Sequence, residues 1–559
     1  MAASSSSRGL RPLAHSTSFK RSTVGRSRLS PVPPFLIPSF STRYRSTSTP
    51  NPPKRKQKEL YNYNTSLSFS ADPDPDHVHW RRVSARDLVH RKEPPTRVKM
   101  LVRDFIDDSL YNPNYGYFSR NATIFTPPKE GFDFASFADT AAFQEAVADR
   151  YEKAYGLEPT TGQQGGLGRQ VWHTPTELFK PYYAQSLITA VLHSYKLYHF
   201  PHQPLLLYEV GAGNGSFMID SLKFLRDHHP DIYAQTKYRI IEISEALAKG
   251  QKQRAEEEGL GSKVEVINED FFKWEGSGNG DEPCFVVALE VFDNFAHDMI
   301  RYDIATLTPM QAVVGIDASG DFSILYEPVT DPLIRRLLAY RRLLPPSPST
   351  SPPLASPLLY SQLLRSAYSS LPFAPNLSPP DFIPTKAVLF LERLREMLPG
   401  HRLMVADFDE LPDAVEGRNG PVVQTRYGGS MIPCETFLVK QGYFDIFFPT
   451  DFTLLREIYS VIMNSPTQKS QLHHDTIPSN PSTEFTPTTI KTPSPPALTK
   501  DFFNHSSSGV KGFRRRNVSI YSHAGFLDKY GGKELCEKTK VGDGGNVMTT
   551  MYKNAKMMF

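Results

Sequence analysis

Acidic residues are absent from the first 58 positions of the chain, and Glu59 is the first acidic side chain. The same stretch is rich in arginine, serine and threonine. An N-terminal segment of this composition is typical of a mitochondrial transit peptide, which the membrane potential draws inward. A basic tail without a targeting role and a chloroplast signal are the alternatives. We expect residues 1–58 to be such a leader, outside the folded core.

Cysteine is also scarce, with three residues in 559: Cys284, Cys434 and Cys536. Their spacing excludes a disulfide framework and a cysteine-rich metal centre, so we expect no metal site. No run approaches the ~20 apolar residues of a membrane-spanning helix. The formal net charge of +4 is inflated by the basic N-terminus. The remainder is near neutral, and we expect no nucleic-acid partner.

Proline, by contrast, is abundant, with 48 residues, and Pro/Ser/Thr tracts divide the chain. We predict a linker at 59–80, an N-terminal helical region at 81–200 with an insertion at 119–168, a core at 201–464 with a disordered insertion at 344–380, a low-complexity insertion at 465–510, and a C-terminal part of the core domain at 511–559. Helical spacing predicts a helix over Thr96–Leu110. Antiparallel strands are expected at 297–302, 311–317 and 322–328.

The core is organised around Leu205–Ser216, LLLYEVGAGNGS. A short apolar run of the buried-strand type leads into a glycine-rich turn, and helical spacing follows. This arrangement brings backbone N–H groups close to a nucleotide-like ligand. Gly211, Gly213 and Gly215 matter because side chains there would hold the ligand away from the backbone. An ordinary strand-to-helix turn is the alternative.

Three more strands are predicted after this turn, and each carries an acid near its end. The strands run over 238–244, 263–270 and 284–292, and their acids are Glu242, Asp270 and Glu290. Glu209 has the same place in the first strand. In a parallel, doubly wound sheet these ends lie along one edge, which is the ligand-binding edge. The sequence therefore predicts an α/β fold of this type.

A carboxylate after the second strand can bind both hydroxyls of a ribose, in NAD as in S-adenosylmethionine (SAM). Three features favour SAM. Ser216 replaces the third glycine of the dinucleotide pattern. Glu209, just before the loop, would repel the phosphates of NAD but can order the turn or meet the ammonium of SAM through water. Asp270 and Phe271 offer an acceptor for the adenine amino group and a ring to cover its face.

The order of several motifs resembles that of the mitochondrial complex I assembly-factor methyltransferases and their bacterial relatives, a branch of the class I SAM-dependent methyltransferases. The motifs are PNYGYF at 113–118, TPTE at 174–177, EVGAGNGS at 209–216, IIEISEALAKGQKQR at 240–254, LEVFDNFAHD at 289–298, VADFDELP at 405–412, GSMIPCETF at 429–437 and DIFFPTDFTLL at 445–455. The resemblance runs from about Asp87 to Phe559, broken by insertions. The glycine loop alone is generic, whereas the order of all the motifs is specific.

The resemblance implies a Rossmann-like SAM domain with an added helical and antiparallel β lobe. It also implies a protein partner: methylation of an arginine in a complex I core subunit, in the mitochondrial matrix, during assembly. By motif position, the cofactor-binding residues would be Gly211, Gly213 and Gly215 along SAM, Glu242 at its ribose, and Asp270 and Phe271 at its adenine. Methylation of another protein side chain or a small molecule, and a catalytically silent scaffold, remain the alternatives.

Arginine is a poor nucleophile while its charge is delocalised, and carboxylates that bind it bidentately localise that charge. Glu290 and Asp293 are the best candidates for this catalytic task. Alternatively, Glu290 orders the SAM end of the sheet and Asp293 caps the following turn. The resembling family usually has Asn-Glu and then Asp-Ala-Leu-Pro here, where this chain reads LE and then DNFA. Both acids are kept, but the residues expected to line the site of the methyl acceptor differ. Cofactor binding is therefore better supported than an arginine substrate.

Overall fold

The computed structural model describes residues 75–120, 122–124, 126–155, 170–276, 282–427, 430–465 and 518–559. All of them lie in the second of the chain's two compact units, Asn62–Phe559. The predicted leader at 1–58 lies outside the described residues, as does the low-complexity insertion at 465–510 after its first residue.

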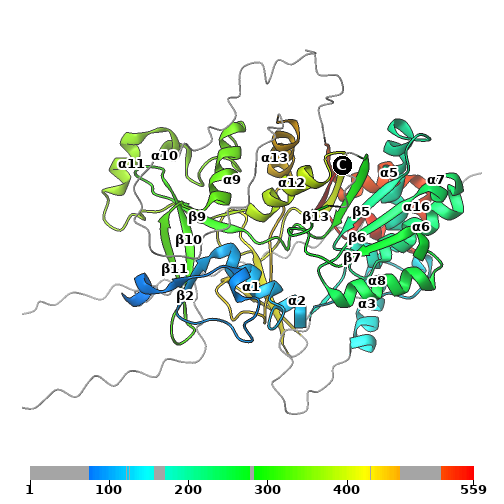
Figure 1. The fold of residues 1–559 in the computed structure, drawn as a ribbon, viewed down its shortest axis with the longest axis horizontal. Coiled ribbons are helices and arrows are strands. Elements are labelled where there is room, and N and C mark those ends of the chain that lie inside the picture. Colours follow the sequence, from blue (N-terminus) through cyan, green and yellow to red (C-terminus); the bar gives the residue numbers. More distant parts are fainter. Residues whose placement is uncertain are drawn as a thin grey trace, which may run out of the picture. The chain divides into compact units, whose positions relative to one another are not determined.

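A seven-stranded sheet carries the glycine-rich turn (Figure 1). Its strands, in spatial order, are β17 (Ile520–Ser522), β18 (Ala555–Met558), β13 (His401–Phe408), β8 (Cys284–Leu289), β5 (Leu206–Val210), β6 (Lys237–Ile241) and β7 (Val264–Ile267). The five strands from β13 to β7 are parallel, whereas β18 is antiparallel to both β13 and β17. The predicted α/β fold with a Rossmann-like sheet is confirmed.

Side chains alternate across β5, so that each face of the sheet carries its own apolar layer. Leu207 packs into one layer, and Leu206 and Tyr208 pack into the other. The helices of the first layer are α5 (Tyr182–Tyr198), α6 (Ser216–His228) and α8 (Glu245–Glu257), and those of the second are α12 (Thr385–Met397) and α13 (Phe452–Asn464). Because β5 is buried along its whole length, its carboxyl end is a fixed platform for the turn that follows.

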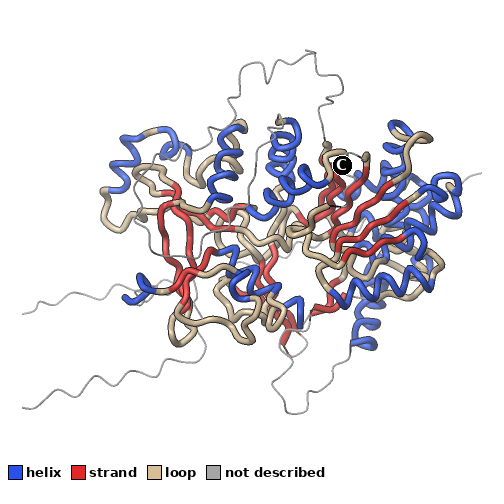
Figure 2. Tube along the Cα trace, viewed as in Figure 1, coloured by secondary structure: helices blue, strands red, loops and turns tan. Residues whose placement is uncertain are grey.

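Strands of the expected β lobe form two further sheets (Figure 2). The six-stranded sheet contains β1 (Arg81–Arg82), β2 (Val98–Leu101), β10 (Pro309–Ile316), β9 (Asp298–Tyr302) and β12 (Asp381–Ile383), with β11 (Phe322–Pro328) also paired to β10. The three-stranded sheet contains β15 (Ser430–Cys434), β14 (Val422–Tyr427) and β16 (Asp445–Phe447). Apart from the parallel pair β1–β2, the strand pairs of these two sheets are antiparallel.

The prediction of one helix over Thr96–Leu110 is wrong in its first part. Val98–Leu101 is β2, and it pairs with the second half of β10. Helix α1 (Val102–Tyr111) begins directly after it. Apolar residues at 98, 101 and 102 fit a helix, whereas those at 98, 100 and 102 alternate as in a strand. The edge of β10 decides for the strand by offering backbone hydrogen-bond partners.

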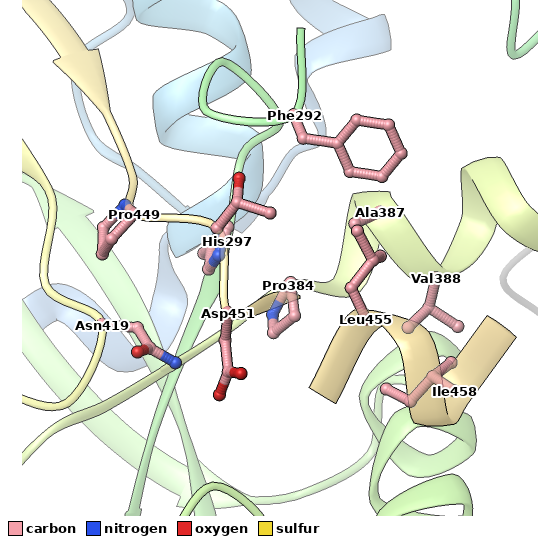
Figure 3. Close-up of a pocket in the computed structure, with 11 residues that line it drawn as sticks. Phe292, His297, Pro384, Ala387, Val388, Asn419, Pro449, Asp451, Leu455 and Ile458 are labelled. Atoms are coloured by element: carbon pink, nitrogen blue, oxygen red, sulfur yellow. The ribbon is translucent and has the colours of Figure 1, made fainter. Parts of the chain in front are cut away.

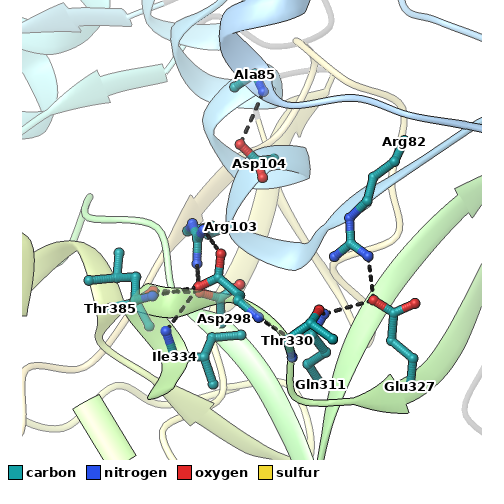
Figure 4. Close-up of polar contacts among 12 residues, drawn as sticks. Arg82, Ala85, Arg103, Asp104, Asp298, Gln311, Glu327, Thr330, Ile334 and Thr385 are labelled. Carbon is teal, nitrogen blue, oxygen red and sulfur yellow. Dashed lines mark hydrogen bonds and ion pairs between the residues drawn. The ribbon is translucent and has the colours of Figure 1, made fainter. Parts of the chain in front are cut away.

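Ion pairs fasten α1 to this sheet (Figure 4). Arg103 donates to Asp298 on β9 at 2.6 Å and to Asp331 at 2.9 and 2.6 Å. Asp331 in turn caps helix α9 (Pro332–Leu343). Thr385 donates to the same oxygen of Asp298 at 2.7 Å. Because the buried carboxylate has both a counter-charge and a hydrogen bond, its burial is tolerated.

The predicted disorder of the insertion 344–380 needs correction. This stretch contains α10 (Ser356–Tyr360) and α11 (Gln362–Ser369). Arg418 ties the insertion to the lobe, since it donates to the backbone oxygens of Pro348 and of Ser351 and also pairs with the buried Asp381 on β12. Proline-rich composition alone does not reveal a distant arginine that organises the backbone of such a segment.

The remaining helices and strands complete the described chain. They are η1 (Pro75–His79), η2 (Ala85–Leu88), α2 (Tyr117–Arg120), β3 (Ala122–Ile124), η3 (Phe134–Ser136), α3 (Thr140–Tyr155), β4 (Gln170–Trp172), α4 (Pro175–Leu178), α7 (Pro230–Gln235), η4 (Gly261–Lys263), α15 (His523–Tyr530), α16 (Gly532–Lys538) and α17 (Val547–Thr550). The region 81–200, predicted to be helical, thus also supplies four strands. None of the described helices combines the length and the apolar character needed to cross a bilayer.

Candidate functional site

The glycine-rich turn lies where the strand order of the sheet reverses. Strand β5 has β6 on one side and β8 on the other, and ligands of such sheets bind beyond the carboxyl ends at this point. Gly211, Gly213 and Gly215 all have positive φ angles, 69°, 53° and 77°, which side chains disfavour. A Cβ on Gly211 would lie 3.2 Å from Cγ2 of Val291. The loop therefore keeps its backbone close to the segment that follows β8.

Glu242 follows β6 directly and is almost completely buried. Its Oε1 accepts a hydrogen bond from the backbone N–H of Ser244 at 2.9 Å, and its Oε2 accepts one from Nε2 of Gln251 at 3.0 Å. The same Gln251 amide donates to the backbone oxygen of Gly213 at 2.8 Å. Burial raises the pKa of Glu242, and these hydrogen bonds oppose the rise. Gln251, which is not among the predicted site residues, joins the acid to the glycine loop.

Glu209 and Glu177 are two further acids near the glycine loop, and each accepts a hydrogen bond from a neighbouring side chain. Tyr238 donates to Glu209 at 2.7 Å, and burial raises the pKa of Glu209 to about 8 although this hydrogen bond lowers it. Ser216, at the start of α6, donates to Glu177 at 2.9 Å. Burial also raises the pKa of Glu177. The serine that replaces the third dinucleotide glycine thus anchors the helix, and Glu177 lies beside the loop.

The two residues expected at adenine differ in exposure. Asp270 is half-buried, and its Oδ1 accepts from the backbone N–H of Phe272 at 3.0 Å. Phe271 is 6% exposed, and its ring packs against Phe390 with centroids 4.4 Å apart. Ile243, by contrast, is 56% exposed directly after Glu242. It is a second apolar candidate for contact with a base, and its position next to the acid of the second strand was the available signal.

The segment after β8 gathers further acids. Glu290 is half-buried and has a φ of 53°, rare for a side-chain-bearing residue. Asp293 is 1% exposed, and Asn294 donates to its Oδ1 at 2.6 Å. Asp407, at the end of β13, holds this segment by accepting from the N–H groups of Phe292 and Asp293 at 2.8 and 3.2 Å. Asp407 was missed, although it lies in the VADFDELP motif.

These acids influence one another. Burial, Asp293, Asp407 and Glu177 all raise the pKa of Glu290 well above its usual range. Burial raises the pKa of Asp293 to about 7. No described lysine, arginine or histidine is ion-paired with Glu290 or Asp293, and no basic side chain is among the causes of their pKa shifts. Glu290 therefore lies close to Asp293, Asp407 and Glu177, and the raised pKa values of these acids favour their protonated forms while no cation is bound.

The residues present fit SAM. Three glycines with positive φ line the turn, a buried acid held in place follows β6, and the neighbouring acids can ionise beside a ligand with a sulfonium and an ammonium group. A separate cavity of about 20 Å³ adjoins this region through Phe292 (Figure 3). It has room for about one or two water molecules. It is thus too small to be the cofactor site.

Comparisons with known proteins agree with this geometry. Residues 187–468 match a family model described as "Putative S-adenosyl-L-methionine-dependent methyltransferase". The "Protein arginine methyltransferase NDUFAF7 homolog, mitochondrial" of Schizosaccharomyces pombe is 23% identical over 354 residues, which are 60% of this chain and 68% of the relative.

Two crystal structures of proteins from Burkholderia thailandensis are also similar. One, bound to S-adenosyl-homocysteine, is 15% identical over 70% of this chain and 79% of its own, with a TM-score of 0.40. The other is 15% identical over 70% and 78%, with a TM-score of 0.37. The family match covers half of this chain, from α5 to α13, and includes the glycine loop and the acids after β6 and β8. The chain therefore belongs to the family of S-adenosylmethionine-dependent methyltransferases that this model describes.

Proposed function

We propose that this methyltransferase acts on an arginine side chain of a mitochondrial complex I core subunit, in the matrix, during assembly of the complex. The observation that carries the proposal is the pair Glu290 and Asp293, which follows β8 and has no basic partner among the described residues. The motif resemblance and the name of the Schizosaccharomyces pombe relative support the acceptor. The acid-free leader supports the location.

The cofactor side of the proposal follows from the turn. Gly211, Gly213 and Gly215 would let the backbone approach SAM, and Glu242 would bind the ribose hydroxyls. Asp270 would accept from the adenine amino group, with Phe271 and the exposed Ile243 as apolar neighbours. Glu209 would order the turn rather than attract the ammonium, because its Oε2 accepts a hydrogen bond from Tyr238 and burial raises its pKa to about 8.

For the acceptor, positioning is the main requirement. SAM supplies a methyl group on a cationic sulfur, so a C–N bond to the guanidine forms as the C–S bond breaks, and the nitrogen loses a proton. Glu290 and Asp293 would hold the guanidinium and localise its charge. A bound cation favours their ionised forms. Glu290, with its raised pKa, is suited to accept the released proton.

Cofactor binding is tested by calorimetry on the full chain. Wild-type protein should bind SAM, and Gly213→Arg should abolish binding, because a long side chain would fill the space beside a residue with φ 53°. Absence of SAM binding by a folded wild-type protein would leave the silent scaffold as the better account.

The acceptor is tested by mass spectrometry of purified complex I from a deletion strain and its parent. We expect one arginine of a core subunit to lose its methyl groups in the deletion strain and to regain them with the wild-type gene. Glu290→Gln should bind SAM normally. In the deletion strain, this variant should restore less than about a hundredth of the wild-type methylation rate, because loss of an acid–base group slows a reaction by about this factor. If every arginine keeps its methylation in the deletion strain, arginine of complex I is not the acceptor.

A further inference from the structure

A second buried carboxylate, Asp445, lies near Asp293 and has no assigned role. It begins β16, opposite Gln424 of β14. The side chain is completely buried, and neither Oδ1 nor Oδ2 has a hydrogen-bond partner of good geometry. Gln424 and the N–H of Ile446 lie near enough to favour its charged form only in part. A buried carboxylate left in this condition is costly.

Asp293 likewise has one carboxylate oxygen without a hydrogen-bond partner. Its Oδ1 accepts from Asn294, whereas Oδ2 is buried without a partner. The backbone connects the two acids: Phe448, three residues after Asp445, donates its N–H to the backbone oxygen of Asp293 at 2.8 Å. Burial, and after it the charge of Asp293, raise the pKa of Asp445. Three acceptor oxygens thus lack a donor, two on β16 and one in the turn that follows β8.

Aromatic side chains border the two acids. Tyr111 donates to the backbone oxygen of Asn294 at 3.0 Å, and both Asp293 and Asp445 raise its pKa, after burial. Tyr117 is fully buried, and burial and Asp445 raise its pKa. Tyr111 and Asn294 are half-buried, so this side of the cluster reaches solvent.

The basic residue in this region is already engaged. Lys386 lies 5.9 Å from the centre of the Tyr111 ring, but its ammonium pairs with Asp107 at 2.8 Å. Neither Asp293 nor Asp445 is ion-paired with a basic side chain in the described part of the chain. A metal ion is not indicated either: the described residues contain no group of three or more His, Cys, Asp or Glu that could hold one.

Two carboxylates with unused oxygens beside aromatic rings match a planar cation with several N–H donors. We propose that Asp445 and Asp293 together bind the guanidinium of the acceptor, with Asp445 as a substrate-binding residue supplied by the three-stranded sheet. This deepens the proposed function and rests on it for the identity of the cation. Position supports it, because Asp293 follows the segment whose Val291 lies against Gly211 of the cofactor loop.

A purely structural explanation also exists, in which the two acids share one proton as a singly charged pair. The two explanations differ in what an isosteric neutral variant does. Asp445→Asn keeps a shared hydrogen bond available to Asp293 and removes a charge. This variant would therefore preserve a pair with a structural role, but it would weaken a binding site for a cation.

The test uses the full chain with S-adenosylhomocysteine bound, and methylguanidinium chloride as the probe. Binding is followed by ligand-observed NMR, with urea as the planar, neutral control. Wild-type protein should bind methylguanidinium and not urea, and Asp445→Asn should weaken that binding at least tenfold. The matched control is Asp220→Asn on α6, which removes another buried carboxylate with an unpartnered oxygen and should leave the affinity unchanged.

Calorimetry with S-adenosylhomocysteine shows whether each variant keeps the cofactor site. Equal methylguanidinium affinity in wild-type and Asp445→Asn protein would overturn the proposal. So would absence of binding to wild-type protein, which needs no variant to fold. The complex I experiment is independent of this one. If methylguanidinium binding depends on Asp445 but complex I keeps its methylation in the deletion strain, only the proposed substrate is refuted.

Discussion

Replacing Glu209 by glutamine should change how the stability of this protein depends on pH. Glu209 is 3% exposed beneath the glycine loop. Burial raises its pKa from 4.5 to about 8, although the hydroxyl of Tyr238 donates to it at 2.7 Å. At neutral pH the folded protein therefore keeps this side chain protonated. Glutamine has nearly the same shape as the protonated acid, and its amide oxygen can accept the same hydrogen bond.

The sign and the size follow from proton linkage. Below pH 4.5 the group is protonated in both states and makes no difference. Between 4.5 and about 8 the unfolded chain loses the proton while the folded one keeps it, so the free energy of unfolding falls by about 1.4 kcal/mol per pH unit. The total loss is on the order of 5 kcal/mol, and it levels off above the folded-state pKa. Glu209→Gln removes this term.

Urea denaturation of both proteins at several pH values between about 5 and 9, without SAM, measures the difference. Tryptophan emission can report unfolding, because Trp274 lies buried in the core beside β5, 5.8 Å from the ring centre of Tyr208. Other acids contribute equally to both curves and cancel. The variant should match the wild type at the acidic end and exceed its stability increasingly as the pH rises. Parallel curves, or a wild type that gains stability relative to the variant, would refute the reasoning.

Four further substitutions, in the same loop or beside it, have expected outcomes. Glu242→Gln should weaken SAM binding roughly 10- to 100-fold by calorimetry, because hydrogen bonds to a charged group contribute about 1.5–3 kcal/mol. Ser216→Ala removes the donor to the buried Glu177 and should cost about 1–3 kcal/mol of unfolding free energy; an unchanged urea midpoint would contradict this. Gly211→Ala should destabilise by about 1–2 kcal/mol at its positive φ, whereas Gly250→Ala, in α8 with open space around it, should stabilise by roughly 0.5–1 kcal/mol.

The parts of the site that sequence could predict are those in which local pattern and position coincide. An apolar run followed by glycines specifies a strand, a turn and a helix, and acids at the strand ends then share one edge. Glu242 and Glu290 could be placed in this way from their positions in the chain. Phe271 shows the limit of such reasoning, since its neighbours in sequence do not reveal that its ring packs against Phe390 on another element.

The parts that sequence could not predict depend on partners far along the chain. Gln251 binds both Glu242 and the loop because α8 returns across the sheet. Asp407 fastens the segment after β8 from a strand more than a hundred residues later. Asp445 arrives from a separate sheet. The periodicity of the sequence does not predict these contacts, because tertiary packing and not local conformation decides which side chains face each other.

Asn294 stands where the resembling family usually has alanine, and its contacts bear on whether this departure silences the site. Its amide donates to Oδ1 of Asp293 at 2.6 Å, and its backbone oxygen accepts from Tyr111 at 3.0 Å. The asparagine therefore uses one oxygen of the acid but fixes the plane of the carboxyl group. A group held in place loses less entropy when it binds a ligand. With Asp445 supplying two more free oxygens, the loss of one is offset, so the altered motif is compatible with an active acceptor site.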